Sequence, residues 1–363
     1  MVNVPSVVDV PAPAETSAPP HGQIEIRADV TKRQWDDFVR THPDGTVEHL
    51  WGWRHVFEQL FGQHAIYLAA GRGGTIVGVL PLVSFRSLIF GRSLVSLPYA
   101  NYGGLVTSDR EAAQALVNRA VEIAGEQRAS HVELRNVAQH LPALPCRQHK
   151  VGSRLSLPRT AEALWSALDR KVRNQVRKAQ KSGLAVERGG ASLLGDFYRV
   201  FSENMRDLGT PVFPKALFTH ALDVVPGHGH VFVVRHDGVP IAGGVGLGFG
   251  RTMLVPWASS LRAHRALCAN VLLYWTMLEF AIESGAEVFD FGRSSRGSST
   301  HAFKQQWGAA DVELHWEYAL RNGGSPPDQG TSNPRMQLMI GAWQRLPLSI
   351  ANALGPIVIR QVP

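Results

Sequence analysis

Cysteine and long apolar runs are scarce in this sequence, and both absences are informative. Only Cys146 and Cys268 occur in 363 residues, which excludes a disulfide-stapled scaffold and is typical of a reducing compartment. The longest stretch without a charged residue, 93–108, contains proline and glycine and is too short for a membrane-spanning helix. Residues 1–22 are rich in proline and lack the basic start and apolar centre of a secretion signal. We therefore expect a cytoplasmic protein that begins with a disordered arm.

Acidic residues are missing from one part of the chain. The formal net charge is +7, and six basic residues between positions 170 and 181 have no acidic residue among them. Without this patch the chain is close to neutral. The charge pattern therefore indicates one surface for an anionic partner rather than a protein that coats nucleic acid. With 44% hydrophobic and 18% charged residues, the chain is globular, not disordered or fibrous.

One order of elements occurs twice along the chain. Residues 66–79 and 231–244 each consist of an apolar run, a short turn with glycine and a second apolar run, which predicts a β-hairpin. An aromatic-rich helical segment precedes each hairpin, at 50–61 and at 193–205. An Ala/Leu-rich helix follows each hairpin, at 112–126 and at 270–283, and leads into a strand, at 131–135 and at 287–291. This order predicts two copies of one mixed α/β unit. The alternative is a chance similarity of two ordinary α/β domains.

A basic helix is predicted at 160–182, with Thr160 as its N-cap and Gly183 as its end. At 100° per residue, one side is apolar and the other basic. The basic side includes Arg173, Arg177 and Lys178. Because no acidic residues are present to form i,i+4 pairs, we expect these side chains to bind phosphate. A solvated charged face is the alternative.

Chemistry-bearing residues gather late in the chain. Asp290, Arg293 and Ser294 follow a predicted strand, and the carboxyl ends of strands are where open α/β sheets bind ligands. Lys304 stands between two aromatic residues, which suits a charge at a cleft. The alternatives are a local structural role for Asp290 and a surface position for Lys304. We expect no metal site, because the pair of histidines at 228–230 has no third ligand at a recognisable spacing.

The ordered motifs of the chain resemble those of the FemAB-like acyltransferases, above all the subfamily associated with exosortase (PEP-CTERM) and exopolysaccharide systems. The motifs are LPL at 80–82, LPYANYGG at 97–104, RKVRNQVRKAQKSG at 170–183, NMRDLGTP at 204–211, PWASS at 256–260, DFGRS at 290–294 and FKQQWG at 303–308. The resemblance implies an α/β protein with mixed sheets, made of two tandem GNAT-like (acyl-CoA N-acyltransferase) domains joined by the basic helix. The implied divisions are a disordered arm at 1–22, GNAT-like domains at 23–152 and 153–320, and a C-terminal extension at 321–363.

The resemblance also implies a reaction: transfer of an activated acyl or aminoacyl group to an amine or hydroxyl of a phosphate-bearing cell-surface polysaccharide or cell-wall precursor. The co-substrate would be acyl-CoA or aminoacyl-tRNA, with no permanently bound cofactor. The partners would be a nucleotide- or lipid-linked sugar, tRNA and, peripherally, a membrane. The competing interpretation is a non-catalytic GNAT-like scaffold that binds an anionic polymer or an export-complex partner.

Matching motifs assign the site residues. Asp290 and Lys304 are the predicted catalytic residues, and the predicted substrate-binding residues outside the basic helix are Asn101, Tyr102, Arg206, Asp207, Trp257, Arg293, Ser294 and Trp307. We expect Asp290, Arg293 and Lys304 to converge on a cleft that Trp257 and Tyr102 also line. Two departures from the family pattern stand out: the loop at 101–103 lacks the family's proline, and residues 262–270 lack the glycines of an acetyl-CoA pyrophosphate loop. The second departure counts against acetyl-CoA as the donor.

Overall fold

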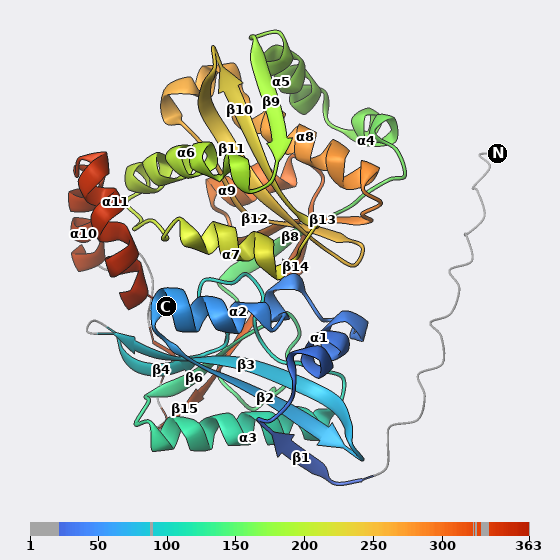
Figure 1. Ribbon diagram of the computed structural model, residues 1–363, viewed down its shortest axis with the longest axis vertical. Helices are drawn as coiled ribbons and strands as arrows, with labels where there is room; N and C mark the ends of the chain where they lie inside the picture. The colour runs from blue at the N-terminus through green and yellow to red at the C-terminus, as the bar shows by residue number, and fades with distance from the viewer. Residues whose placement is uncertain (1–21, 88–89, 322, 324, 328–333, 363) are drawn as a thin grey trace, which may run out of the picture.

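The computed structural model describes residues 22–87, 90–321, 323, 325–327 and 334–362, folded around two β-sheets (Figure 1). The predicted disordered arm lies outside the described residues except for Gly22. Within the described part of the chain, no helix is both long and apolar enough to cross a membrane.

The first sheet carries most of the strands of the first half of the chain and one strand, β15, from near its end. Its order is β1 (Ile24–Arg27), β2 (His64–Arg72), β3 (Thr75–Ser87), β4 (Gly91–Val95), β6 (His131–Asn136), β15 (His315–Leu320) and β7 (Cys146–Arg147), with β5 (Val106–Thr107) paired to β3. The helix α3 (Arg110–Glu126) begins at Asp109, whose carboxylate accepts from two backbone N–H groups of its first turn. Its apolar side packs on this sheet.

The second sheet has the same plan. Its order is β9 (Leu184–Gly189), β10 (Gly229–His236), β11 (Val239–Phe249), β12 (Thr252–Ser260), β13 (Val288–Ser295), β8 (Lys150–Ser156) and β14 (Ala310–Glu313). Among the described strands, one pair of neighbours in each sheet is parallel: β4 with β6 in the first and β12 with β13 in the second. A helix joins each parallel pair, α3 in the first unit and α8 (Ala269–Glu283) in the second. The predicted hairpins occupy equivalent places, which confirms the repeat.

The two units exchange a strand. β8 follows the first unit in the chain but pairs with β13 of the second sheet, while β15 follows the second unit but pairs with β6 of the first. The predicted domain boundaries, which place 315–320 in the second domain, therefore do not follow the sheets. Pairing between distant strands is set by tertiary packing, and neither strand's own pattern of residues encodes its partner.

The predicted basic helix is two helices, α4 (Ala161–Ala167) and α5 (Arg170–Gln180), and in this respect the prediction is wrong. Leu168 is extended between them, and the Asp169 carboxylate accepts from the N–H of Lys171 as a new N-cap. Both helices pack on α8, on the side of the second sheet that faces away from the first sheet (Figure 1). They therefore do not span the junction of the two units.

The junction is filled by a shared apolar core with residues from both sheets. The first unit contributes α1 (Lys32–Thr41), the 3₁₀ helix η1 (Val47–His49), α2 (Gly52–His55) and the π-helix η2 (Val56–Leu60). The second contributes α6 (Leu194–Asp207) and α7 (Ala216–Val224). Beyond the second sheet, α9 (Ser299–Gln305) packs on β13. The last helices, α10 (Pro334–Gln344) and α11 (Leu348–Val358), pack on α6. The site described next lies at this junction.

Candidate active site

Asp290 is the centre of a buried ionic cluster made by both units. It lies on β13 and is 1% exposed. One carboxylate oxygen accepts from the Tyr102 hydroxyl at 2.8 Å and from the Gly292 N–H at 2.8 Å, and the other accepts from Arg154 Nε at 2.7 Å. Arg154 belongs to β8, so the exchanged strand supplies the counter-ion. A buried carboxylate with this many donors is held in one orientation.

The backbone turn after Asp290 is fixed from two sides. The pairing of β13 with β8 shifts register between Asp290 and Arg293, and Gly292 has a φ of +69°. A Cβ at Gly292 would lie 2.9 Å from Asn101 Oδ1, which itself accepts from the Arg293 N–H at 3.1 Å. On the other side, the Lys304 ammonium donates to the carbonyl oxygens of Gly292 (2.9 Å) and Arg293 (3.0 Å). Only glycine fits position 292.

Lys304 is itself buried, at 3% exposure. Burial lowers the pKa of its ammonium to about 8, although the nearby Asp290 carboxylate works in the opposite direction. The lysine is therefore not a solvated surface residue, as the alternative interpretation had it. It also does not line the cavities of the junction. It supports the turn that carries Gly292 and Arg293.

Glu48 is a second buried carboxylate, and the sequence analysis missed it. It is 4% exposed. Its carboxylate accepts from the backbone N–H of Asn101 (2.8 Å), from the side-chain amide of Asn101 (3.0 Å) and from the backbone N–H of Tyr102 (2.7 Å). Burial raises its pKa to about 7, against the effect of these hydrogen bonds and of the Arg293 charge. Its only sequence signal is a single acid in an aromatic-rich segment, which is weak.

A cationic cluster adjoins the turn. The guanidinium groups of Arg135 and Arg293 lie 4.5 and 5.2 Å from the ring of Trp316, which β15 brings in. Arg135 pairs with the buried Glu133 at 2.8 Å. The Nη1 atoms of both arginines and the Ser294 hydroxyl are buried, and none of them has a hydrogen-bond partner among the residues that the structure describes. Unused buried donors of this kind suit an anionic group of a substrate.

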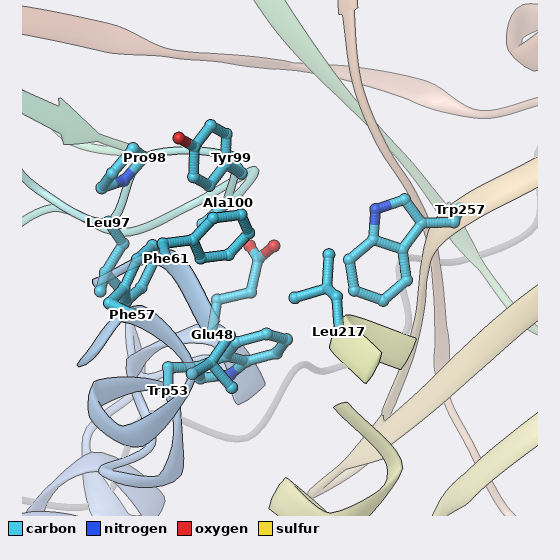
Figure 2. A pocket seen from close by; sticks show the side chains of 11 residues that line it. Glu48, Trp53, Phe57, Phe61, Leu97, Pro98, Tyr99, Ala100, Leu217 and Trp257 are labelled. Carbon is cyan, nitrogen blue, oxygen red and sulfur yellow. The ribbon is translucent and has the colours of Figure 1, made fainter. Parts of the chain in front are cut away.

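Two cavities lie on either side of the segments 47–48 and 100–102. Asp290, Tyr102 and Arg154 line a polar cavity of about 150 Å³. Glu48 and Trp257 line a small apolar cavity of about 20 Å³, which is room for about one water molecule (Figure 2). Of the five residues predicted to meet at one cleft, Asp290 and Tyr102 line the polar cavity. Arg293 and Lys304 lie at the turn after Asp290 and not in the cavity wall, and Trp257 lines the other cavity.

A third, larger cleft of about 470 Å³ lies at the start of α8. Its lining includes Arg262, His264 and Arg265 together with the first turn of α8. The N–H groups at a helix start attract phosphate. The pairing of β12 with β13 ends at Leu254 and Asp290, so the two strands separate beside this cleft.

Several predicted binding residues lie elsewhere. Arg173, Arg177 and Lys178 are on α5, on the outer side of the second sheet. Arg206 pairs with Asp207 at 2.7 Å and donates to the carbonyl of Leu346, so both belong to the contact with the C-terminal helices.

Trp307 is also away from the cavities. It is buried in the apolar core, with its ring near those of Tyr274 and Phe303. Among the described residues, no group of three His, Cys, Asp or Glu side chains is placed to hold a metal ion.

Comparisons with known proteins agree with this architecture. Residues 166–305 match the family model of an acetyltransferase (GNAT) domain. The lipid II:glycine glycyltransferase of Staphylococcus aureus is 28% identical over 203 residues, which cover 50% of this chain and 46% of that protein. The chain therefore spans about half the length of the curated relatives it matches.

Solved structures show the same fold. FemX superposes with a TM-score of 0.63 at 20% identity, covering 81% of this chain and 97% of that one. The C-terminal domain of a putative lysylphosphatidylglycerol synthetase from Agrobacterium fabrum has a TM-score of 0.54 at 14% identity, with 80% and 92% covered. A tandem GNAT protein from the clavulanic acid pathway has a TM-score of 0.50 at 14% identity, with 84% and 100% covered. The tandem GNAT-like fold is confirmed.

Proposed function

We propose, from the premise that this is a FemAB-like protein of the GNAT fold, that it transfers an activated acyl or aminoacyl group to an amine or hydroxyl of a phosphate-bearing cell-wall or cell-surface precursor. The observation that carries the proposal is the buried cluster around Asp290, where both units meet beside the separating strands β12 and β13. Acyl transfer needs fixed polar groups in a place shielded from water.

In the proposed step, the acceptor nitrogen or oxygen forms a bond to the acyl carbonyl carbon. The bond from that carbon to the donor's sulfur or ribose oxygen breaks, the acceptor loses a proton, and the leaving group is protonated. Of the buried carboxylates, Asp290 and Glu48 line the two cavities and are placed to take the proton. Because a general base works best with a pKa near the working pH, the raised pKa of Glu48 favours Glu48. Asp290 then holds the turn and the Tyr102 hydroxyl.

Phosphate groups have two places to bind in this scheme. The cluster of Arg135 and Arg293 beside the turn suits a phosphate of the acceptor, since both have unused buried donors. The cleft at the start of α8 suits the phosphates of the donor, acyl-CoA or aminoacyl-tRNA. Gln175 of α5 lines this cleft and also the surface that bears Lys178. A long donor such as tRNA would reach the basic side of α5 from the cleft.

An apolar surface on the C-terminal helices supports a membrane contact. The exposed apolar side chains there are Leu338, Met339, Ile350, Leu354 and Ile357. Three of them recur on α11 at the spacing of one helix face. An apolar helix face supports contact with the surface of a bilayer, where a lipid-linked acceptor would be found. Exopolysaccharide or exosortase-associated precursors remain part of this proposal.

Transfer of label tests the proposal. The purified chain is incubated with radiolabelled acyl-CoA or charged tRNA and with nucleotide- or lipid-linked precursors, and the label in the precursor is counted. Transfer by the wild-type chain, lost in Asp290→Asn and kept in a variant of the exposed residue Val121 (Val121→Ser), supports the proposal. Binding of the precursor without transfer from any donor would instead support the non-catalytic scaffold.

A further inference from the structure

The polar cavity beside Asp290 is large enough for one ring of a substrate. Its volume is about 150 Å³, and an apolar cavity of this size in another protein holds one benzene ring. Strands of the second sheet form one wall, and the loop 43–47 and Tyr102 of the first unit form the other. A group bound in this cavity therefore lies between the two units and against Asp290.

Two rows of residues on neighbouring strands form the wall of the second sheet. Leu254 of β12 pairs with Asp290 of β13 in the inner row, and Thr252 pairs with Val288 in the outer row. Residues two apart on a strand point to the same face and lie roughly 7 Å apart. A ring that fills the cavity therefore has one edge at Asp290 and the opposite edge at Thr252.

The outer end of the cavity opens into a cleft. Phe249 and Thr252 line both the cavity and this cleft, which has a volume of about 430 Å³. Arg40, in the last turn of α1, places its guanidinium 5.6 Å from the centre of the Phe249 ring. The outer substituents of a ring in the cavity, and the rest of a long acceptor, can thus extend into the cleft.

The charges in the cavity wall decide which rings fit. The wall contains two acids, Asp44 and Asp290, and one base, Arg154. Arg154 is already paired with Asp290 at 2.7 Å, so the Asp44 carboxylate is in excess. The basic group beside Asp44 is the His42 ring at 3.9 Å, and burial lowers the pKa of His42. A carboxylate or phosphate in the cavity would therefore be repelled.

The hydrogen-bonding groups of the wall match the hydroxyl groups of a sugar. The Asp290 carboxylate already accepts three hydrogen bonds, so a charged ammonium beside it would be left unpaired, at a large cost. Arg154 donates to Asp290 through Nε and has further N–H groups, and the Thr252 hydroxyl can donate and accept. The aromatic rings of Tyr102 and Phe249 offer apolar surface to the C–H groups of a sugar. An uncharged amine, the form that attacks a carbonyl carbon, fits the same place as a hydroxyl.

We propose that this cavity binds one sugar ring of the acceptor, a neutral sugar or an amino sugar, that it excludes sugar acids, and that the reacting hydroxyl or amine is on that ring. The inference rests on the proposed function, since it names the group that receives the acyl or aminoacyl group. The competing acceptor is the amine of a peptide side chain, which binding measurements separate from a sugar.

Titration calorimetry with small acceptor fragments tests the inference without any transfer. The probes are the methyl glycosides of glucose, glucosamine and glucuronic acid, with Nα-acetyl-lysine amide as the peptide amine. The wild-type chain should bind the glucoside or the glucosaminide at least about tenfold more tightly than the glucuronide and the lysine derivative. The preferred one of the two sugars identifies the reacting group as a hydroxyl or an amine.

Two variants and their matched controls locate the binding. Val288→Phe fills the outer row of the cavity and should abolish sugar binding, whereas Val239→Phe, at a strand residue that is 43% exposed, should change nothing. Asp44→Asn keeps the size of the side chain and removes its charge. It should narrow the difference between the glucoside and the glucuronide about threefold. Asp37→Asn, at an exposed acid outside the cavity wall, should leave that difference unchanged.

A thermal melt checks the fold of each variant, and Asp44→Asn keeps the test decisive if Val288→Phe does not fold. Equal binding of the glucoside and the glucuronide, tighter binding of the lysine derivative, or sugar binding that survives in a folded Val288→Phe would overturn the inference. Label transfer to a peptide amine would then still support the proposed function. Sugar binding that is lost in Val288→Phe, with no transfer from any donor, would overturn the proposed function and support the cavity assignment.

Discussion

Replacing Glu48 by Gln should change how the stability of the protein depends on pH. Burial raises the pKa of Glu48 from its ordinary 4.5 to about 7. Between these two values the folded chain holds a proton that the unfolded chain has lost, so the free energy of unfolding falls as the pH rises. The contribution is fully lost only above pH 7. A Gln side chain does not titrate and removes this dependence.

The size of the effect follows from the two pKa values. Each unit of difference between the folded and unfolded pKa corresponds to about 1.36 kcal/mol. Between pH 5 and pH 8 the unfolding free energy of the wild-type chain should therefore fall by about 2–3 kcal/mol more than that of Glu48→Gln. The Gln side chain has one acceptor oxygen for the N–H donors of Asn101 and Tyr102. An unsatisfied donor costs about 1–3 kcal/mol at every pH. The variant should therefore be the less stable chain at pH 5, and the gap should close or reverse by pH 8.

Urea unfolding followed by tryptophan fluorescence at pH 5, 6, 7 and 8 measures this difference. Glu126→Gln, at an exposed side chain of α3, is the matched control and should follow the wild-type curve at each pH. A constant difference between the wild-type chain and Glu48→Gln across the series would refute the buried, protonatable state of Glu48.

Three further outcomes follow from the structure. Lys304→Ala removes the ammonium that donates to the carbonyl groups of Gly292 and Arg293. The variant should have an unfolding free energy about 2–4 kcal/mol lower and a lower kcat for transfer. An unchanged kcat in a folded variant would count against the positioning role of Lys304. Arg173→Gln with Arg177→Gln should flatten the log–log salt dependence of tRNA binding by about 1–2, and an unchanged slope would remove α5 from the donor site. Ile357→Ser should reduce sedimentation with vesicles of anionic lipid, while Val121→Ser on α3 should not; equal sedimentation of both would exclude the α11 face.

The repeat could be predicted because its signals are local. Apolar alternation and turn residues identify the hairpins at 66–79 and 231–244, and both form with the expected partners. The exchange of β8 and β15 has no such signal, because the residues of a strand do not name a distant partner. The break in the basic helix did have one: Asp169 followed by basic residues is an N-cap pattern, which the continuous apolar periodicity across 160–182 concealed.

The candidate site was predictable in part for the same reason. Asp290 stands out because it follows a strand and precedes small residues, and Lys304 because it lies between two aromatic residues. In the structure, both side chains bind the backbone of the turn at Gly292. Glu48 acquires its significance only from the loop at 101–102 that folds onto it. Trp307 looks like a binding residue beside Lys304, but the same aromatic character makes it a core residue once α9 packs on β13.

The central claim is that one catalytic centre is assembled from both units, and a double-mutant cycle on transfer rate tests it most directly. Tyr102 of the first unit donates to Asp290 of the second at 2.8 Å. If the two side chains act as one unit, Tyr102→Phe and Asp290→Asn should each lower kcat for label transfer, and the double variant should lose little more than the worse single variant. Independent losses that multiply in the double variant, or full activity in both single variants, would contradict a shared centre at this junction.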